Sequence, residues 1–238
     1  MKNRLNICVD TLVLEVTRRC NCCCDHCLRG EQQNMDMPKE VIDKVLDTFD
    51  AISNVVFTGG EPSLNLDAIH YFFEQAELRG KIPFSFFIAT NGLENQYELA
   101  CLLLKYYPLM EEPECCEVCI SQDRFHPFGT KDPALRVSPL AGLSFYQKDS
   151  KAHSDNESDD WLINEGNADR HDLGCRKSRG AMPLNISSEG DGEVRFEQLY
   201  VSANGNIQEN CDLSYEHIDG LALTTLDGLC DYVQEQLY

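Results

Sequence analysis

Short apolar runs alternate with amphipathic segments along the first half of the chain. Four of the runs are rich in β-branched or aromatic residues and predict buried strands, which cover residues 11–17, 55–58, 84–90 and 117–121. Three segments between them carry apolar residues at helical spacing and predict helices that begin near Pro38, Asp67 and Glu94. Strands that alternate with helices in this way predict βαβ units and a parallel sheet, so we expect an α/β fold.

The pattern changes after the fourth predicted strand. Residues 147–160 are polar and acidic and predict a mobile loop, and residues 161–163 predict a fifth strand. Farther on, residues 194–202 predict a strand, Asn204-Gly205 predicts a hairpin turn, and a short helix is expected over about residues 225–237. We therefore expect a core domain over residues 1–190 and a short C-terminal extension over residues 191–238.

Composition and charge argue against several classes of protein. The formal net charge is −20, whereas nucleic-acid binding through phosphates needs a basic face, so no nucleic-acid partner is expected. No stretch is apolar enough to span a bilayer, and the first residues lack the pattern of a signal peptide, which predicts a cytoplasmic protein with no membrane partner. In such a chain, thirteen cysteines indicate metal or cluster ligation more than disulfides.

The densest group of cysteines lies just after the first predicted strand. Cys20, Cys24 and Cys27 stand in the spacing C-x3-C-x2-C and supply three thiolates, one fewer than a closed four-ligand site needs. Three ligands on a four-iron cluster leave one iron open to bind something else. Cys22 and Cys23 lie in the same run. A zinc site with four ligands, chosen from these five cysteines and His26, therefore stays an alternative.

A glycine-rich element follows the second predicted strand directly, with the sequence Gly59-Gly60-Glu61-Pro62. Two glycines allow a close backbone approach and positive φ angles. The cysteine spacing followed by this element resembles the radical SAM superfamily. The resemblance implies a partial (β/α)6 TIM-like barrel, open on one side, with a 4Fe-4S cluster and S-adenosylmethionine (SAM) at the carboxyl ends of the strands.

Site residues follow from the same resemblance. Cys20, Cys24 and Cys27 are expected to hold the cluster, and the glycine-rich element is expected to meet the amino group of SAM. Ser121 is placed to bond to the ribose or carboxylate, and His26 stands where the family usually has an aromatic residue near the adenine. The expected SAM-binding residues are Gly59, Gly60, Glu61, Pro62, Thr90, Asn91, Ser121, Asp123 and His26. Residues 166–168 loosely resemble the point where the family contacts the adenine.

The expected substrate side begins where the fourth strand ends. There, Arg124 can pair with a carboxylate and His126 can move a proton, although both side chains can equally serve to fix the loop. Cys211, with Cys175 as a second choice, is the candidate for a catalytic thiol that quenches a substrate radical.

The C-terminal hairpin followed by Cys211 resembles the opening of the SPASM-type domain, which binds auxiliary clusters in many peptide-modifying radical SAM enzymes. That domain normally holds many more cysteines, so an auxiliary cluster on Cys175, Cys211 and Cys230 is the lesser expectation. The resemblance implies reductive cleavage of SAM to a deoxyadenosyl radical that abstracts a substrate hydrogen, with electrons from a flavodoxin or ferredoxin-type donor in an anaerobic setting. A ribosomally synthesised peptide is the first substrate hypothesis. Small-molecule biosynthesis (of a nucleoside, deazapurine or sugar) and a non-catalytic zinc or iron–sulfur module remain alternatives.

Overall fold

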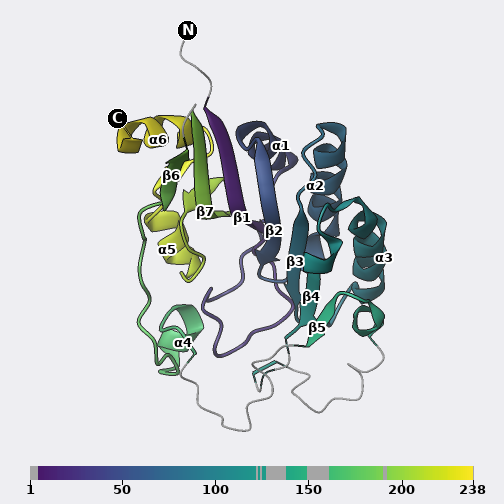
Figure 1. The fold of residues 1–238 in the computed structure, drawn as a ribbon. Helices are drawn as coiled ribbons and strands as arrows, with labels where there is room; N and C mark the ends of the chain where they lie inside the picture. The colour runs from purple at the N-terminus through teal and green to yellow at the C-terminus, as the bar shows by residue number, and fades with distance from the viewer. Residues whose placement is uncertain are drawn as a thin grey trace.

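One mixed sheet runs through the computed structural model, which describes residues 5–121, 123, 125–126, 138–148, 161–189 and 192–237. The strand order is β5-β4-β3-β2-β1-β7-β8-β9, and β6 pairs with β7 (Figure 1). The strands are β1 (Asn6–Thr17), β2 (Ala51–Gly59), β3 (Ser85–Thr90), β4 (Glu117–Ile120), β5 (Tyr146–Lys148), β6 (Ile186–Glu189), β7 (Glu193–Val201), β8 (Asn206–Gln208) and β9 (Thr224–Thr225). The neighbouring strands in the series β5-β4-β3-β2-β1-β7 are all parallel. In contrast, β6, β8 and β9 pair in antiparallel fashion. This open and mostly parallel sheet confirms the predicted α/β fold and is compatible with a partial barrel.

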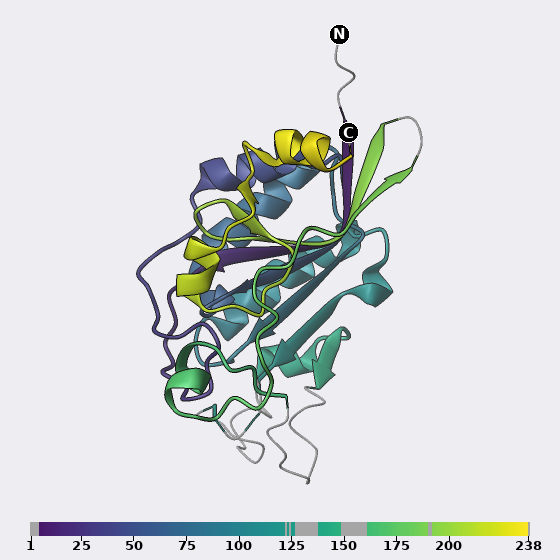
Figure 2. The same ribbon diagram turned by 90° about the vertical axis from the view of Figure 1, so that its left-hand side faces the viewer.

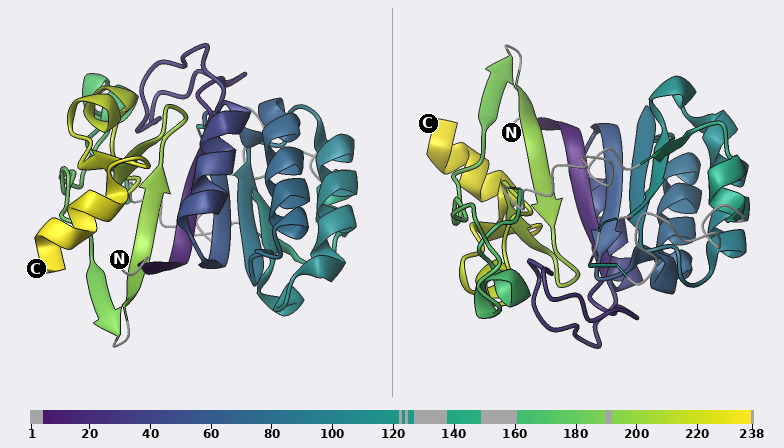
Figure 3. Two further views of the ribbon diagram at one scale, coloured as in Figure 1. Left: turned by 90° about the horizontal axis from the view of Figure 1, so that it is seen from above. Right: turned by 90° about the horizontal axis from the view of Figure 1, so that it is seen from below.

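Three helices cover one face of the sheet side by side (Figure 3). They are α1 (Lys39–Thr48), α2 (Leu66–Leu78) and α3 (Gln96–Tyr106), and the shorter helices are α4 (Gly166–Arg170), α5 (Tyr215–Gly220) and α6 (Leu229–Leu237). Among the described residues, no helix combines the length and the apolar character that crossing a bilayer requires.

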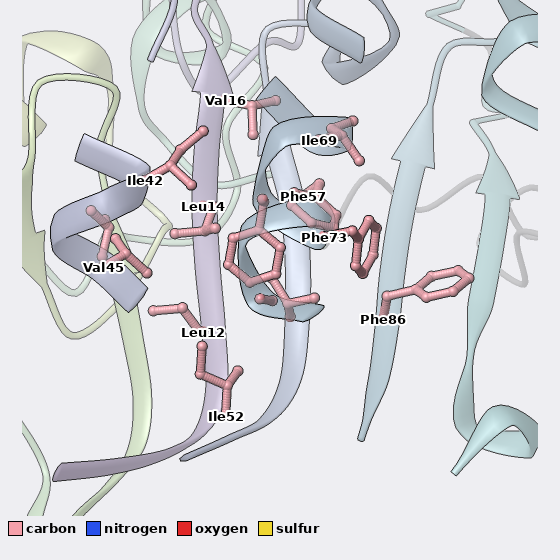
Figure 4. Packing of buried hydrophobic residues seen from close by; sticks show 14 of the residues in the cluster. Leu12, Leu14, Val16, Ile42, Val45, Ile52, Phe57, Ile69, Phe73 and Phe86 are labelled. Atoms are coloured by element: carbon pink, nitrogen blue, oxygen red, sulfur yellow. The ribbon is translucent and has the colours of Figure 1, made fainter. Parts of the chain in front are cut away.

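The core lies between this helical layer and the sheet, as the close view in Figure 4 shows. Phe57 of β2 meets Phe73 of α2 edge to face, with ring centroids 5.3 Å apart, and Phe73 in turn meets Phe86 of β3 at 6.0 Å. All three rings are almost fully buried, and each contributes about 1.5–3 kcal/mol by leaving water. This packing fixes the strands whose carboxyl ends carry the candidate site.

The fifth strand differs from the prediction. Tyr146 of β5 pairs with Val118 of β4, whereas Ile163 makes only an isolated bridge with Arg176. The backbone around residue 163 therefore bonds to its own neighbouring segment, which periodicity over three residues could not reveal. Of the predicted mobile loop, residues 147–148 belong to β5 and residues 149–160 lie outside the described residues.

The C-terminal segment follows the predicted hairpin but joins the main sheet. β7 and β8 pair across the turn at Gly205, whose φ is +84°. β7 also runs parallel to β1, with Leu199 opposite Leu12. The expected division near residue 190 remains a prediction, and β7 belongs to the same sheet as the strands before it.

Candidate functional site

A cavity of about 240 Å³ opens at the carboxyl end of β1, where the cysteine loop begins. Five thiols line it, from Cys20, Cys22, Cys23, Cys24 and Cys27, and no disulfide links any of them. Its other walls include Arg18, Arg29, Gly60, Asn167 and Tyr215. A larger cavity of about 730 Å³ lies beside Ile7, near the opposite end of β1. None of the residues that line the cysteine cavity lies in its wall.

The cysteine loop is held from two sides. On one side, the Asn91 amide donates to Asn21 Oδ1 at 2.7 Å and approaches Cys22 Sγ at 3.5 Å. On the other side, Asn167 of α4 donates its backbone N–H to the Cys27 carbonyl at 2.8 Å and its side-chain amide to the Cys24 carbonyl at 3.1 Å. Figure 2 shows α4 beside this loop. The loosely matched residues 166–168 therefore contact the cysteine loop itself.

Burial makes the thiols of Cys20, Cys22 and Cys24 hard to ionise without a compensating cation, because it raises the pKa of each. Burial, together with the neighbouring thiols at Cys22, Cys27 and Cys20, raises the pKa of Cys24 to about 12. Burial likewise raises the pKa of Cys20 to about 12. Thiolates rather than thiols bind metal, so a positively charged metal centre is the group that would stabilise this arrangement.

The glycine-rich element packs directly on the backbone of the cysteine loop. A Cβ at Gly59, whose φ is +152°, would lie 2.0 Å from the Thr17 carbonyl oxygen, and one at Gly60 would lie 2.4 Å from that of Arg19. The Gly60 N–H donates to Thr17 at 2.8 Å and the Glu61 N–H donates to Arg19 at 2.8 Å. The chain's own backbone thus requires both glycines, and Gly60 remains in the cavity wall.

Glu61 ties together the ends of three elements. It is 1% exposed, and its Oε1 accepts hydrogen bonds from Thr90 Oγ1 at 2.7 Å and from the Ser63 N–H at 3.0 Å. Oε2 accepts from the Asn91 N–H at 2.7 Å, while Pro62 begins a short 3-10 helix over Pro62–Asn65. The structure therefore gathers Glu61, Thr90 and Asn91, and the carboxylate positions the other two.

Another group of predicted residues meets at the end of β4. His26 Nε2 lies 3.5 Å from Asp123 Oδ2, and His126 Nδ1 lies 2.8 Å from Asp123 Oδ1. Burial alone would raise the pKa of Asp123, but the hydrogen bond and charge of His126, together with His26, hold it below its usual value. The Ser121 N–H donates to the Thr90 carbonyl at 2.8 Å, which links this end of β4 to β3. Arg124 lies outside the described residues.

The cysteines of the tail lie in three different surroundings. Cys211 packs on a small apolar cluster that contains Val13 and Tyr200, and burial raises its pKa. Cys175 is exposed, and the exposed Cys230 lies in the wall of the cavity beside Ile7. The roles expected for these thiols remain predictions.

Sequence reasoning missed a polar wall that faces the cysteines. The buried Arg18 pairs with Glu15 at 2.5 Å and with both carboxylate oxygens of Asp219 at 2.8 Å, and its guanidinium lies 4.7 Å from the centre of the Tyr215 ring. Arg29 donates to the Leu213 carbonyl at 2.7 Å. The Tyr215 hydroxyl is buried and has no hydrogen-bond partner within the described part of the chain. Arg18 and Arg29 flank the cysteine run in the sequence, and they were the signal that could have revealed this wall.

Comparison with known proteins agrees with the resemblance. Residues 14–125 match the family model of the radical SAM superfamily, a stretch that contains the cysteine loop, the glycine-rich element and the end of β4. Members of this superfamily are enzymes that use a 4Fe-4S cluster and SAM. The resemblance seen in the sequence is therefore confirmed for this part of the chain.

Individual relatives are distant. The uncharacterized protein MJ0907 of Methanocaldococcus jannaschii is 42% identical over 62 residues, which are 24% of this chain and 21% of that protein, so the match spans about a fifth of the relative. Among solved structures, anSMEcpe with bound AdoMet and Cp18Cys peptide is 12% identical, with 93% of this chain and 77% of that chain covered and a TM-score of 0.47. Streptococcus suis SuiB bound to the precursor peptide SuiA is 13% identical, with 92% and 64% covered and a TM-score of 0.41.

Proposed function

We propose that this chain, which carries a radical SAM domain over residues 14–125, cleaves SAM reductively and uses the product to abstract a hydrogen atom from a substrate. The observation that carries the proposal is the cavity of about 240 Å³ in which five thiols face Gly60. Three thiolates at Cys20, Cys24 and Cys27 suit a four-iron cluster with one open iron. Because Cys22 and Cys23 line the same cavity, the ligand triplet itself is part of the proposal.

The residues of this chain fit such a cluster. The cavity offers thiol ligands, and the buried Tyr215 hydroxyl in its wall has no hydrogen-bond partner among the described residues. The side chains of Arg18 and Arg29 line the same cavity as the thiols. When bound, the cluster and SAM supply the one-electron cleavage that yields the hydrogen-abstracting radical.

The protein's own part is to hold and orient. Asn167 and Asn91 fix the cysteine loop by hydrogen bonds, so the thiols remain converged. The glycine-rich element brings peptide groups without side chains next to them, and peptide carbonyls can accept hydrogen bonds from an ammonium group such as that of SAM. Glu61 positions Thr90 and Asn91 rather than facing the cavity itself.

For the substrate we propose a ribosomally synthesised peptide. A second cavity of about 470 Å³ shares Arg29, Gly30 and Tyr215 with the cysteine cavity, and its wall includes carboxylates, among them Glu31 and Glu216. The second cavity is lined mainly by polar groups and adjoins the cysteine cavity, which suits a substrate with extended polar groups. The β7–β8 hairpin before Cys211 keeps the likeness to a peptide-modifying domain. A small metabolite is the competing substrate, and a flavodoxin or ferredoxin-type donor is proposed as the source of electrons.

The first experiment is anaerobic reconstitution with iron and sulfide, followed by reduction and EPR with and without SAM. We expect about four irons per chain, a signal that shifts on adding SAM, and formation of deoxyadenosine. Serine variants of the five cysteines identify the triplet: Cys20, Cys24 and Cys27 should each be required, whereas Cys22 and Cys23 should not. Cys101→Ser, at an exposed position of α3, is the matched control. Tight zinc with no response to SAM would instead support a structural metal protein.

A further inference from the structure

His26, Asp123 and His126 form a compact donor set beside the cysteine loop. Their ligating atoms all lie within 4.8 Å of one another, although the residues come from two segments far apart in the sequence. The side chains are 11%, 14% and 15% exposed, respectively. We propose that these three residues bind a single divalent metal ion of the zinc type, at a site separate from the cysteine cavity. The proposal does not rest on the proposed function, and it gives His26 and Asp123, which the resemblance placed near SAM, a different role.

The donor set has the chemistry of an open metal site. Two imidazoles and one carboxylate are the protein ligands of several catalytic zinc centres and of non-haem iron sites that keep positions open. Bonds of about 2.0–2.1 Å in a tetrahedral site place neighbouring ligands about 3.3–3.4 Å apart. His26 Nε2 lies 3.5 Å from Asp123 Oδ2, His126 Nδ1 lies 2.8 Å from Asp123 Oδ1, and one ligand atom from each of the three residues falls within 4.8 Å of the others. Side-chain movements of about 1–1.5 Å would bring all three atoms to the spacing of metal ligands.

The surroundings hold this geometry in place before any ion binds. Asp123 Oδ1 accepts hydrogen bonds from the backbone N–H groups of Phe125 at 2.9 Å and His126 at 3.1 Å, which orients the carboxylate. The Phe125 ring stacks on His26 with centroids 4.5 Å apart, and Trp161 meets the same imidazole edge-on at 5.8 Å. Such outer contacts fix ligand orientation and limit water access.

An ion at this place would have an open coordination position, because three protein ligands do not fill a tetrahedral site. His26 directly precedes Cys27, so the ion would lie next to the cysteine loop. It would act as a Lewis acid that orients a substrate oxygen or nitrogen. The competing explanation is a hydrogen-bonded His–Asp–His chain without metal, which uses the same atoms.

The test uses the full chain with its iron–sulfur cluster reconstituted, so that the proposed cluster ligands Cys20, Cys24 and Cys27 are already occupied. After equilibration with zinc and removal of loosely bound metal, zinc and iron are counted by mass spectrometry. We expect about one zinc per chain in addition to the iron, since three ligands make one site. His126→Ala and Asp123→Asn should each weaken zinc binding by about 100-fold or more. His171→Ala, at a side chain that is 53% exposed, is the control and should bind zinc as the parent does.

X-ray absorption at the zinc edge gives a readout that does not depend on variants that fold. Nitrogen and oxygen ligands at about 2.0–2.2 Å support the site, whereas sulfur at about 2.3 Å assigns the zinc to cysteines and overturns it. A cluster-loaded protein that binds no zinc also overturns it. If that protein still cleaves SAM, the proposed function stands while this inference fails. If zinc is bound by nitrogen and oxygen but no competent cluster forms, this inference stands while the proposed function fails.

Discussion

Gly59 illustrates how strongly a single position is constrained by the chain itself. The sequence suggested that glycine serves a ligand here, and the geometry shows that the Thr17 carbonyl already excludes any side chain. The same close contact brings the glycine-rich element against the cysteine loop. Structural and functional demands on this residue therefore coincide.

Gly59→Ala is expected to destabilise the fold by at least about 2 kcal/mol, because the new Cβ would meet a backbone oxygen and the φ of +152° is unfavourable for alanine. Urea unfolding of the cluster-free chain measures the change. Gly142→Ala is the control, since a Cβ there meets nothing within 4 Å, and it should lie within about 0.5 kcal/mol of the parent. Equal stability of both variants would contradict the clash.

Tyr215 is the residue most suited to tune a cluster in the cysteine cavity. Its hydroxyl is buried. Burial raises its pKa, the charges of Glu15 and Cys27 act in the same direction, and the charge of Arg29 opposes them. Hydrogen bonds to cluster sulfurs make reduction easier. Tyr215→Phe should therefore lower the ratio of reduced to oxidised cluster about tenfold at a given potential, a shift of about 59 mV for one electron, in an EPR-monitored redox titration. Tyr97→Phe, at a residue 68% exposed, should leave the potential unchanged.

At the scale of elements, a buried carboxylate joins α4 to α5. Glu165 immediately precedes α4, and its Oε2 accepts the Ser214 N–H at 3.0 Å and lies 2.9 Å from His217 Nδ1. Burial alone would raise the pKa of Glu165, but the hydrogen bonds from Ser214 and His217 bring it below its usual value. Because α4 also holds the cysteine loop, this contact links the C-terminal segment to the site.

The sign of the pH dependence follows from that lowered pKa. Stability from Glu165 is present above the unfolded-state pKa of about 4.3 and is lost as the pH falls through the folded-state value. Glu165→Gln should therefore cost about 1–2 kcal/mol at pH 7, and the difference from the parent should shrink below about pH 4. Urea midpoints measured from pH 7 to pH 3 check this, with the exposed neighbour Glu216→Gln as control. A difference that grows on acidification would contradict the assignment.

At the scale of the whole molecule, both ends of the chain build one sheet. β7 covers the edge of β1, and Asp219 of α5 completes the partners of the buried Arg18. Removing β7 and α5 would expose that edge and leave the arginine with fewer buried partners. Such a change is expected to lower the free energy of unfolding more than the loss of a surface extension would.

A chain that ends after residue 190 is therefore expected to lose cooperative folding, because Phe196 and Leu199 leave the core together with their strand. Near-UV circular dichroism and a thermal scan of the truncated chain test this against the full one. A truncated chain with a cooperative transition and native near-UV signal would show instead that residues 1–190 form an independent domain.

The sequence by itself determined most of the regular elements and the cysteine loop. Spacing of apolar residues over two to four positions reflects which face of a helix or strand is buried, so β1 to β4 and α1 to α3 were predictable. The C-x3-C-x2-C spacing and the glycine pair could be recognised as well, because each lies within a few consecutive residues.

Only the tertiary structure decided which distant residues meet. β5 replaced the expected strand at residues 161–163 because pairing to β4, rather than local periodicity, defines an edge strand. Tyr215 beside Arg18 and Asp123 between His26 and His126 depend on the path of the whole backbone. Contacts across such separations leave no periodic trace in a single sequence, because the chain between them can follow many paths until the core fixes one.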